Sequence, residues 1–233
     1  MLHSDISVTA YDWVPSVAQG QVRDLRLRWA LREAGFDYDV ELIPQGTQGE
    51  PANLARQPFG QIPALTIDGM PMFESGACAW KIAEASKNLL PDHMAGRDAC
   101  LSWVFAALNT IEVPLSMLAT LGFFETAPKH FGLADGKAAA AVRPGARQLA
   151  DQRLRQFDTE LGGRQHIVGD RFTVADLMLT AVLLIADRLD ILAPHRGAKA
   201  YFDMHTARPA YREARAEQIE PFALNAPKYQ SAS

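Results

Sequence analysis

The sequence predicts a fold of the class α/β plus all-α, in which a small α/β domain precedes an all-helical domain. Two observations lead to this prediction. Strand-like and helix-like segments alternate over the first ~90 residues, and strand signals disappear from Arg97 onward. We expect an α/β domain over residues 1–90 and a helical domain over residues 97–233, joined by a linker that contains Pro91 and Asp92. A length of 233 residues suffices for a sizeable core.

The first three elements follow from the spacing of apolar residues. Ile6 and Val8 alternate with polar neighbours and indicate a first strand. Apolar residues at helical spacing over 22–34 predict a helix, and Gly35 stands where a C-cap glycine belongs. The clean alternation over 36–42 predicts a second strand.

The rest of the first domain contains a loop, a hairpin and a helix. Asp68-Gly69 is a dipeptide favoured in two-residue hairpin turns, because both turn positions need positive φ. Ser75 is expected to cap the helix that follows the hairpin. The expected segments are a loop over 44–60, a short helix around 52–56, strands over 64–67 and 70–73, and a helix over 75–87.

Helical patterns fill the second domain. The expected helices cover 97–121, 137–161, 173–189, 197–206 and 208–217. Pro114 should kink or break the first of them, because proline lacks the N–H that a helix interior requires. Thr173 and Asp176 fit a capping box, and Phe172 can staple against Leu177. We assign this motif to folding and not to catalysis.

Composition excludes several functional classes. The net charge of −4 predicts no nucleic-acid or anionic-membrane partner. The first residues lack a signal-peptide pattern, and no apolar run approaches a membrane span, so a cytoplasmic protein is expected. The two cysteines form no CxxC pair, and the six histidines show no metal-ligand spacing. We therefore expect no metal. Cys78 is interpreted as a small buried hydrophobic residue.

A proline stands at the entrance of the third predicted strand. Pro63 begins an edge strand or shapes a specified turn, since proline is excluded from central strands. The chain resembles cytosolic glutathione transferases over essentially its whole length. Three stretches carry the resemblance: PFGQIPAL at 58–65, FESGA at 73–77 and GDRFTVADL at 169–177.

The resemblance implies a thioredoxin-like N-terminal domain with a cis-proline at Pro63 and a C-terminal helical bundle domain that shapes the electrophile pocket. It implies glutathione as substrate, a homodimer and a role in detoxification. Ile62 would pair with the cysteinyl backbone of glutathione, as in strand addition. Ser75, at a helix N-terminus, would bind the γ-glutamyl carboxylate. Glu74 would hold the α-ammonium group or organise the site, and Gln61 is a further candidate for a hydrogen bond to the ligand.

Catalysis in this family requires the glutathione thiolate. The pKa of a free thiol is about 8.5, and a hydrogen-bond donor at sulfur lowers it. The resemblance implies a Ser or Tyr hydroxyl near the end of the first strand or the start of the first helix. Ser16 is the first candidate, with a loop or capping role as its alternative, and Tyr11 is the second. Gln21 and Arg23 could also reach sulfur. Residues 10–24 contain no cysteine, which argues against thiol transfer.

By the same resemblance, four residues are expected at the electrophile pocket: Trp13, Leu108, Glu112 and Leu115. The apolar ones could equally belong to the core. The leading hypothesis is conjugation of glutathione to a hydrophobic electrophile. A glutathione-dependent isomerase or lyase on the same scaffold, or a non-catalytic glutathione-binding or assembly protein, are the alternatives. The arginines of the first helix, at 23, 26, 28 and 32, are interpreted as a solvated face with an interface salt bridge and not as a nucleic-acid patch.

Overall fold

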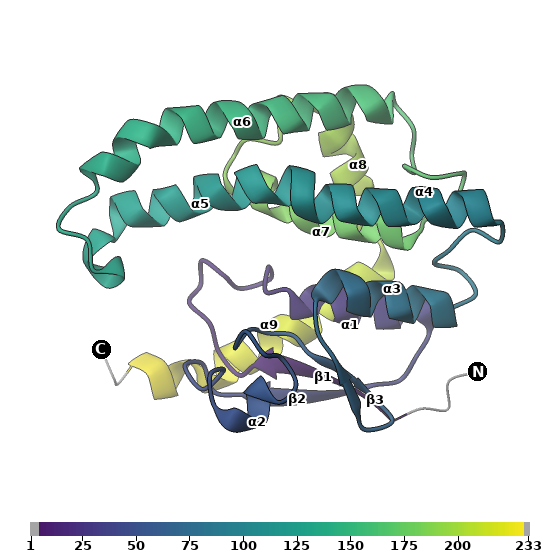
Figure 1. Cartoon of the computed structure of the whole chain (residues 1–233), viewed down its shortest axis with the longest axis horizontal. Helices are drawn as coiled ribbons and strands as arrows, with labels where there is room; N and C mark the ends of the chain where they lie inside the picture. The colour runs from purple at the N-terminus through teal and green to yellow at the C-terminus, as the bar shows by residue number, and fades with distance from the viewer. Residues whose placement is uncertain (1–4, 231–233) are drawn as a thin grey trace.

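The computed structural model describes residues 5–230, and these place a four-stranded mixed sheet in the first domain (Figure 1). The strands stand in the order β2-β1-β3-β4 and comprise β1 (Ile6–Tyr11), β2 (Asp39–Ile43), β3 (Leu65–Ile67) and β4 (Met70–Met72). Strand β1 pairs in parallel with β2 and antiparallel with β3. Asp68 and Gly69, with φ angles of 51° and 77°, close the β3–β4 hairpin, which confirms the predicted turn.

Three helices complete the first domain: α1 (Asp24–Ala34), α2 (Pro51–Leu54) and α3 (Ser75–Ala85). Figure 1 shows α1 and α3 side by side between the sheet and the helical domain. Trp29 of α1 is fully buried, and its ring meets the ring of Tyr211 edge-on at 5.0 Å. Gly35 ends α1 with a φ of 70°, as the sequence predicts.

The second domain is helical within the described residues. Its elements are α4 (Met94–Phe105), η1 (Ala106–Ile111), α5 (Glu112–Thr126), η2 (Pro128–Phe131), α6 (Lys137–Leu161), α7 (Val174–Arg188), α8 (Arg196–Thr206) and α9 (Pro209–Gln230). Helices α5 and α6 lie side by side (Figure 1). Helix α7 is buried along most of its length and lies at the centre of the helical core.

The region around Pro114 differs from the prediction. Residues 94–126 form one continuous helix and do not break at the proline. The turn directly before α5, Ala106–Ile111, is instead π-helical. A wider turn accommodates a residue that cannot donate a backbone hydrogen bond, and such turns are frequent at functional sites. One consequence is that Glu112, the first residue of α5, is buried and faces the first domain.

Helix α7 begins with the capping box that the sequence predicts. The Asp176 carboxylate accepts hydrogen bonds from the backbone N–H of Thr173 at 2.8 Å and from its hydroxyl at 2.9 Å. Both residues are fully buried. The motif therefore starts the central helix of the core, in agreement with its assignment to folding.

Helix α9 extends well beyond the predicted end at 217. It returns from the helical domain and packs along α1 (Figure 1). Tyr229 near its end stacks on Trp13 with ring centroids 4.7 Å apart, and its hydroxyl donates to Asp12 Oδ1 at 2.7 Å. This packing on the first domain offsets the poor helical propensity of the prolines inside α9.

The interpretation of the α1 arginines as a solvated face was wrong for two of them. Arg26 and Arg28 are only 4% and 1% exposed. Arg28 pairs with Asp24 at 2.8 Å and with Glu217 of α9 at 2.9 Å. Alternation of charge with apolar residues cannot reveal such burial, because the partners come from distant parts of the chain. Cys78 is fully buried, as predicted.

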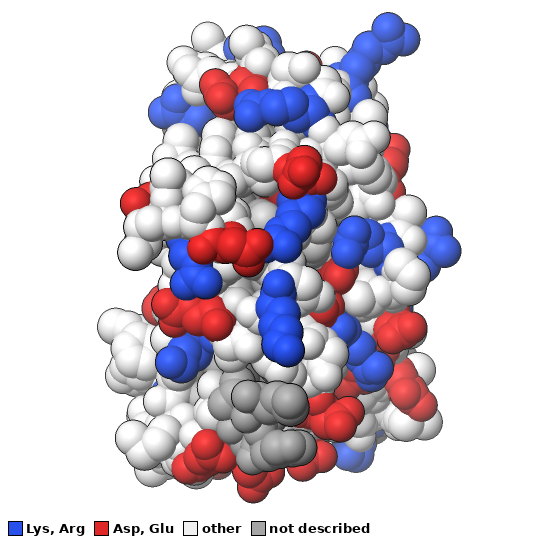
Figure 2. Space-filling view, turned by 90° about the vertical axis from the view of Figure 1, so that its right-hand side faces the viewer, with Lys and Arg blue, Asp and Glu red and all other residues white. Residues whose placement is uncertain are grey.

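One helix, Met94–Thr126, is long and apolar enough to cross a membrane by composition alone. It packs against α6 and α7 in the helical domain, so one side of the helix belongs to the core, whereas other apolar residues such as Phe105 and Val113 are exposed. On the face shown in Figure 2, basic and acidic side chains are interspersed. That face carries no extended field of one sign of the kind that favours nucleic acid.

Candidate functional site

The turn before β3 is anchored on both sides of Ile62. The Ile62–Pro63 peptide bond is cis, as the resemblance implies. On one side, the Gln57 side chain accepts from the backbone N–H of Gln61 at 3.1 Å. On the other, the N–H of Ala64 donates to the Thr9 hydroxyl at 2.7 Å. Ile62 is thereby held in a fixed position just before β3, which is an inner strand of the sheet and not an edge strand.

The start of α3 differs in detail from the prediction. Glu74 is the N-cap residue, and Ser75 is the first residue of the helix. Glu74 has a φ of 68°, which is costly for a residue with a side chain and is found mainly where function requires it. Ser75 is 7% exposed, and its hydroxyl accepts a hydrogen bond from Arg26 Nη1 at 3.1 Å. The hydroxyl proton of Ser75 is then free to point at an anion near the helix N-terminus.

A buried ion cluster links this helix start to the second domain. Arg26 Nη2 and Arg23 Nη2 both lie 2.9 Å from Glu112 Oε1. Burial works to raise the pKa of Glu112, but the two guanidinium groups outweigh it and hold that pKa below its usual value. Burial lowers the pKa of Arg26, an effect that the Glu112 carboxylate opposes. The cluster joins α1, α3 and α5 at one point.

The predicted glutathione-binding residues lie together. A small pocket beside the cis-proline is lined by Arg23, Gln57, Gln61, Ile62, Pro63, Glu74 and Ser75. It combines backbone of an anchored turn, a helix N-terminus, one carboxylate and one arginine. These groups can bind the free carboxylate and the free ammonium group of a short peptide that extends into the adjoining larger cavity.

A larger cavity of about 810 Å³ lies between the two domains next to this pocket. Residues of the β1–α1 loop, the cis-proline turn, α5, α6 and α7 line it. Tyr11, Gln21 and Arg23 are among the lining residues, whereas Ser16 is not. Ser16 is exposed, and its carbonyl accepts from Arg188 Nη2 at 2.8 Å.

Tyr11 lines the large cavity and can contribute a hydroxyl to it. It is the last residue of β1, directly before the loop, and it is half-buried. Burial raises the pKa of Tyr11 above its usual value. The phenol therefore stays protonated at neutral pH and can donate a hydrogen bond to an anionic sulfur.

The residues expected at the electrophile pocket are dispersed. Glu112 lines the large cavity. Trp13 stacks on Tyr229, and Leu115 is fully buried in the core. Leu108 lines a second cavity of about 710 Å³ between α3 and α4. The apolar pattern of a helix does not tell which buried face looks toward a cavity and which toward the core.

Among the cavity residues that sequence reasoning missed are two arginines of the helical domain. Arg143 of α6 and Arg188, the last residue of α7, both line the large cavity. Arginines on helix surfaces are common, and no local motif distinguishes these from others. Only the packing of α6 and α7 against the β1–α1 loop brings them to the site.

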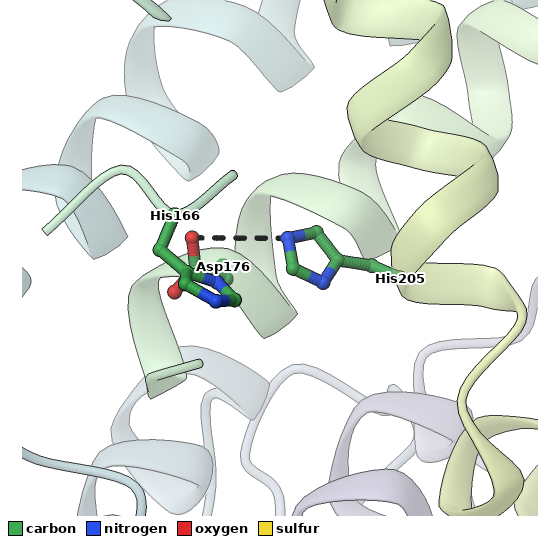
Figure 3. A group of neighbouring side chains, drawn as sticks. All are labelled: His166, Asp176 and His205. Atoms are coloured by element: carbon green, nitrogen blue, oxygen red, sulfur yellow. Dashed lines mark ion pairs between the residues drawn. The ribbon is translucent and has the colours of Figure 1, made fainter. Parts of the chain in front are cut away.

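One group of side chains in the described part of the chain could share a cation (Figure 3). It consists of His166, Asp176 and His205, whose ligand atoms all lie within 4.8 Å of one another. The spacing rules applied to the sequence missed this group, because its members come from a loop, α7 and α8. His3, another of the histidines, lies outside the described residues.

The Asp176 carboxylate is already committed to the protein. Besides its two bonds from Thr173, its Oδ1 accepts from the backbone N–H of Ile167 at 2.8 Å and from the hydroxyl of Tyr201 at 2.7 Å. Four donors use the lone pairs that a metal ion would need. We assign the group to the capping of α7 and the docking of α8.

Fold and site together define a two-domain protein in which an α/β domain with a cis-proline turn shares a cleft with a helical domain. Family comparison agrees. Residues 25–85 match the glutathione S-transferase N-terminal domain, and residues 117–209 match the glutathione S-transferase C-terminal domain. The chain belongs to the glutathione S-transferase family.

Individual relatives are moderately similar. Glutathione S-transferase 3 of Zea mays is 28% identical over 205 residues, covering 81% of this chain and 86% of that protein. Maleylacetoacetate isomerase of Rhizobium meliloti (strain 1021) is 31% identical over 176 residues, covering 71% and 78%. A crystal structure of a glutathione transferase family member from Pseudomonas fluorescens pf-5 with two glutathione bound has a TM-score of 0.72 and 24% identity, covering 90% and 92%. It shares the fold.

Proposed function

We propose that this glutathione S-transferase binds glutathione across Ile62 and Glu74-Ser75 and conjugates its thiolate to a hydrophobic electrophile. The observation that carries the proposal is the juxtaposition of the anchored cis-proline turn with the start of α3, where Arg26 holds the Ser75 hydroxyl at 3.1 Å. The turn offers backbone groups to the cysteinyl residue. The helix start offers a hydroxyl and free N–H groups to the γ-glutamyl carboxylate.

In this mechanism Tyr11 stabilises the thiolate. Its neutral phenol donates a hydrogen bond to sulfur, and Arg23 at the edge of both pockets adds a positive charge nearby. The thiolate then attacks the electrophilic carbon of a substrate in the cavity of about 810 Å³, and a carbon–sulfur bond forms. Of the two hydroxyl candidates, Tyr11 is favoured over Ser16 because Ser16 does not line that cavity.

Binding is tested by calorimetry with glutathione. Ser75→Ala and Glu74→Ala are each expected to weaken glutathione affinity about tenfold, the factor that corresponds to one lost hydrogen bond or ion pair of roughly 1.4 kcal/mol. Ser102→Ala is the control, since that hydroxyl bonds the Asp98 carbonyl within α4 and lines neither large cavity. Unchanged affinity in both site variants would reject this site.

Thiol activation is tested by the ultraviolet absorbance of the bound thiolate against pH. Tyr11→Phe is expected to raise the pKa of bound glutathione by about one unit or more, because the donor at sulfur is lost. Ser16→Ala is expected to leave that pKa unchanged. The reverse result would transfer the role to Ser16.

A second function is supported by one comparison. The relative at 31% identity is named maleylacetoacetate isomerase, so a glutathione-dependent isomerisation on this scaffold is the alternative. It uses the same glutathione site and thiolate. Product analysis with a cis-enone substrate separates the two: isomerisation returns glutathione unchanged, whereas conjugation consumes it. Glutathione binding without turnover of either kind would favour the binding or assembly role.

We further propose that the protein acts as a homodimer. The support is the apolar cavity of about 710 Å³ along α3 and α4. Exposed apolar side chains surround it, among them Phe105 and Val113, each 57% exposed. Contiguous apolar surface of this kind marks a contact face.

A further inference from the structure

The large cavity is basic although the chain as a whole is acidic. One carboxylate lines it, that of Glu112. Four arginines line it as well: Arg23, Arg26, Arg143 and Arg188. The chain carries a net charge of −4. Glu112 serves Arg23 and Arg26 together. On the wall formed by the helical domain, Arg143 is paired with Glu125, which does not line the cavity, and the charge of Arg188 is not neutralised by Glu112.

Arg143 lies at the cavity wall and has one hydrogen-bond donor without an acceptor. Its Nη1 lies 3.2 Å from Glu125 Oε2, and the guanidinium lies across Gly122 of α5, 3.7 Å from where a Cβ of that residue would stand. Its Nε is buried and has no acceptor among the described residues. A buried donor without an acceptor costs free energy, which an anion in the cavity would recover.

Arg188 has neutral partners in residues 5–230. Its Nη1 donates to the carbonyl of Gln19 at 3.2 Å and its Nη2 to that of Ser16 at 2.8 Å. Arg188 takes part in none of the ion pairs found among the described residues. These bonds fix the guanidinium against the β1–α1 loop and leave its charge uncompensated at the cavity.

We propose that the second substrate carries a carboxylate, which Arg143 and Arg188 hold on the helical-domain side of the cavity. The guanidinium group is the side chain best suited to this task, because its fork of donors matches a planar carboxylate. The inference rests on the proposed function and narrows it: the electrophile is an acidic, otherwise apolar molecule. The two arginines are specificity-determining residues and take no part in thiolate formation.

The test uses a matched pair of electrophiles, 4-chloro-3,5-dinitrobenzoate and its methyl ester. In both, the glutathione thiolate adds to the carbon that bears chlorine, a carbon–sulfur bond forms, and chloride leaves with the electrons of the carbon–chlorine bond. The wild-type protein is expected to have a higher kcat/KM for the carboxylate than for the ester. Arg143→Gln and Arg188→Gln are each expected to lower that carboxylate-to-ester ratio about tenfold, as for one lost charged hydrogen bond.

The chain offers a closely matched control. Arg147 lies one turn further along α6. Its side chain is 43% exposed, and that of Arg143 is 44% exposed. Arg147 pairs with Asp151 at 3.3 Å, and Arg143 pairs with Glu125 at 3.2 Å. Arg147 does not line the cavity. Arg147→Gln is expected to leave the ratio unchanged, so a general effect of removing charge from α6 is separated from an effect at the cavity.

Three results would overturn the inference. The first is a wild-type ratio at or below one, and the second is a ratio that neither Arg143→Gln nor Arg188→Gln changes. The third is a weaker affinity for glutathione alone in these variants with an unchanged ratio, which would assign the arginines to the glycyl carboxylate of glutathione.

If neither electrophile is turned over, the proposed conjugation reaction is rejected, but the binding of a carboxylate by Arg143 and Arg188 is not yet tested. In that case calorimetry with the two S-aryl glutathione conjugates, one with a carboxylate and one with a methyl ester, decides. Tighter binding of the carboxylate conjugate that Arg143→Gln abolishes supports the inference, and equal binding of the two conjugates rejects it.

Discussion

Arg26 connects the proposed glutathione site with the interface between the two domains. Its guanidinium bonds both the Ser75 hydroxyl and the Glu112 carboxylate while it is 4% exposed. A buried charge pair contributes little net stability, but removing one partner leaves a desolvated charge behind. Arg26 therefore positions Ser75 and neutralises Glu112 at the same time.

Because Arg26 has both roles, a second substitution should restore the free energy of unfolding without restoring the affinity for glutathione. Arg26→Met is expected to lower the free energy of unfolding by about 3–5 kcal/mol, because Glu112 keeps only the partly exposed Arg23. Adding Glu112→Gln should recover most of that loss. Glutathione affinity should stay weak in both variants, since neither restores the bond to Ser75. Urea unfolding and calorimetry measure the two quantities, and recovery of affinity in the double variant would contradict the positioning role.

His205 makes stability depend on pH. Burial lowers the pKa of this residue to about 4, despite the neighbouring Asp176 carboxylate. The unfolded imidazole takes up a proton near pH 6.5, whereas the folded one does so only near pH 4. The unfolded state thus binds more protons between these values, and stability is lost as the pH falls from about 6.5 to 4.

The expected loss from His205 is about 1–3 kcal/mol at pH 4, less than the full linkage because neighbouring groups relax. His205→Asn is expected to flatten the dependence in this window. Urea unfolding at a series of pH values measures it. An equally steep curve in the variant would show that other groups are responsible.

At the scale of elements, the end of α9 holds two loops beside the large cavity, the one that follows β1 and the one that follows β2. The Tyr229 hydroxyl donates to Asp12 and accepts from the backbone N–H of Gln45 at 3.0 Å. Asn225 donates to the carbonyl of Asp12 at 3.2 Å. Asp12 directly follows Tyr11, and Gln45 lines the large cavity. The last turns of α9 therefore hold the loop that directly follows Tyr11, the proposed thiolate donor.

Tyr229→Phe is expected to loosen these loops and keep the fold. The ring can still stack on Trp13, but both hydroxyl bonds are lost. Amide exchange over 12–23 and 44–48 should accelerate roughly tenfold, which corresponds to about 1.4 kcal/mol of local stability. Leu224→Ala, which alters a 74% exposed side chain of the same helix, is the control. Unchanged exchange in Tyr229→Phe would mean that the stack alone holds the loops.

Across the whole molecule, the proposed dimer makes a prediction with a matched control. Val113 and Val142 are 57% and 56% exposed, but only Val113 lines the cavity between α3 and α4. Val113→Glu is expected to convert the dimer to a monomer, because a charge in a buried contact is costly, whereas Val142→Glu should have no effect. Sedimentation velocity measures the state. A wild-type monomer at micromolar concentration would refute the dimer.

The order of elements and the grouping of residues beside the cis-proline could be predicted from the sequence, because local signals specify them. The Asp68-Gly69 turn, the capping box at Thr173 and the cis-proline motif each carry their information within a few residues. The buried state of Arg26 and the cavity face of Arg143 could not be predicted. Both depend on partners far away in the chain, Glu112 for the first and Gly122 for the second.

The return of α9 to the first domain bears on the order in which the protein matures during synthesis. Arg28 and Asp24 on α1 are each about 1% exposed, and their partners Glu217 and Gln218 lie on α9. When the first domain has been synthesised, Asp24 and Arg28 therefore still lack their partners on α9. More than a hundred further residues must be synthesised before these partners are present. The first domain therefore reaches its final packing only after α9 has been synthesised, and the proposed glutathione site is completed at the same stage.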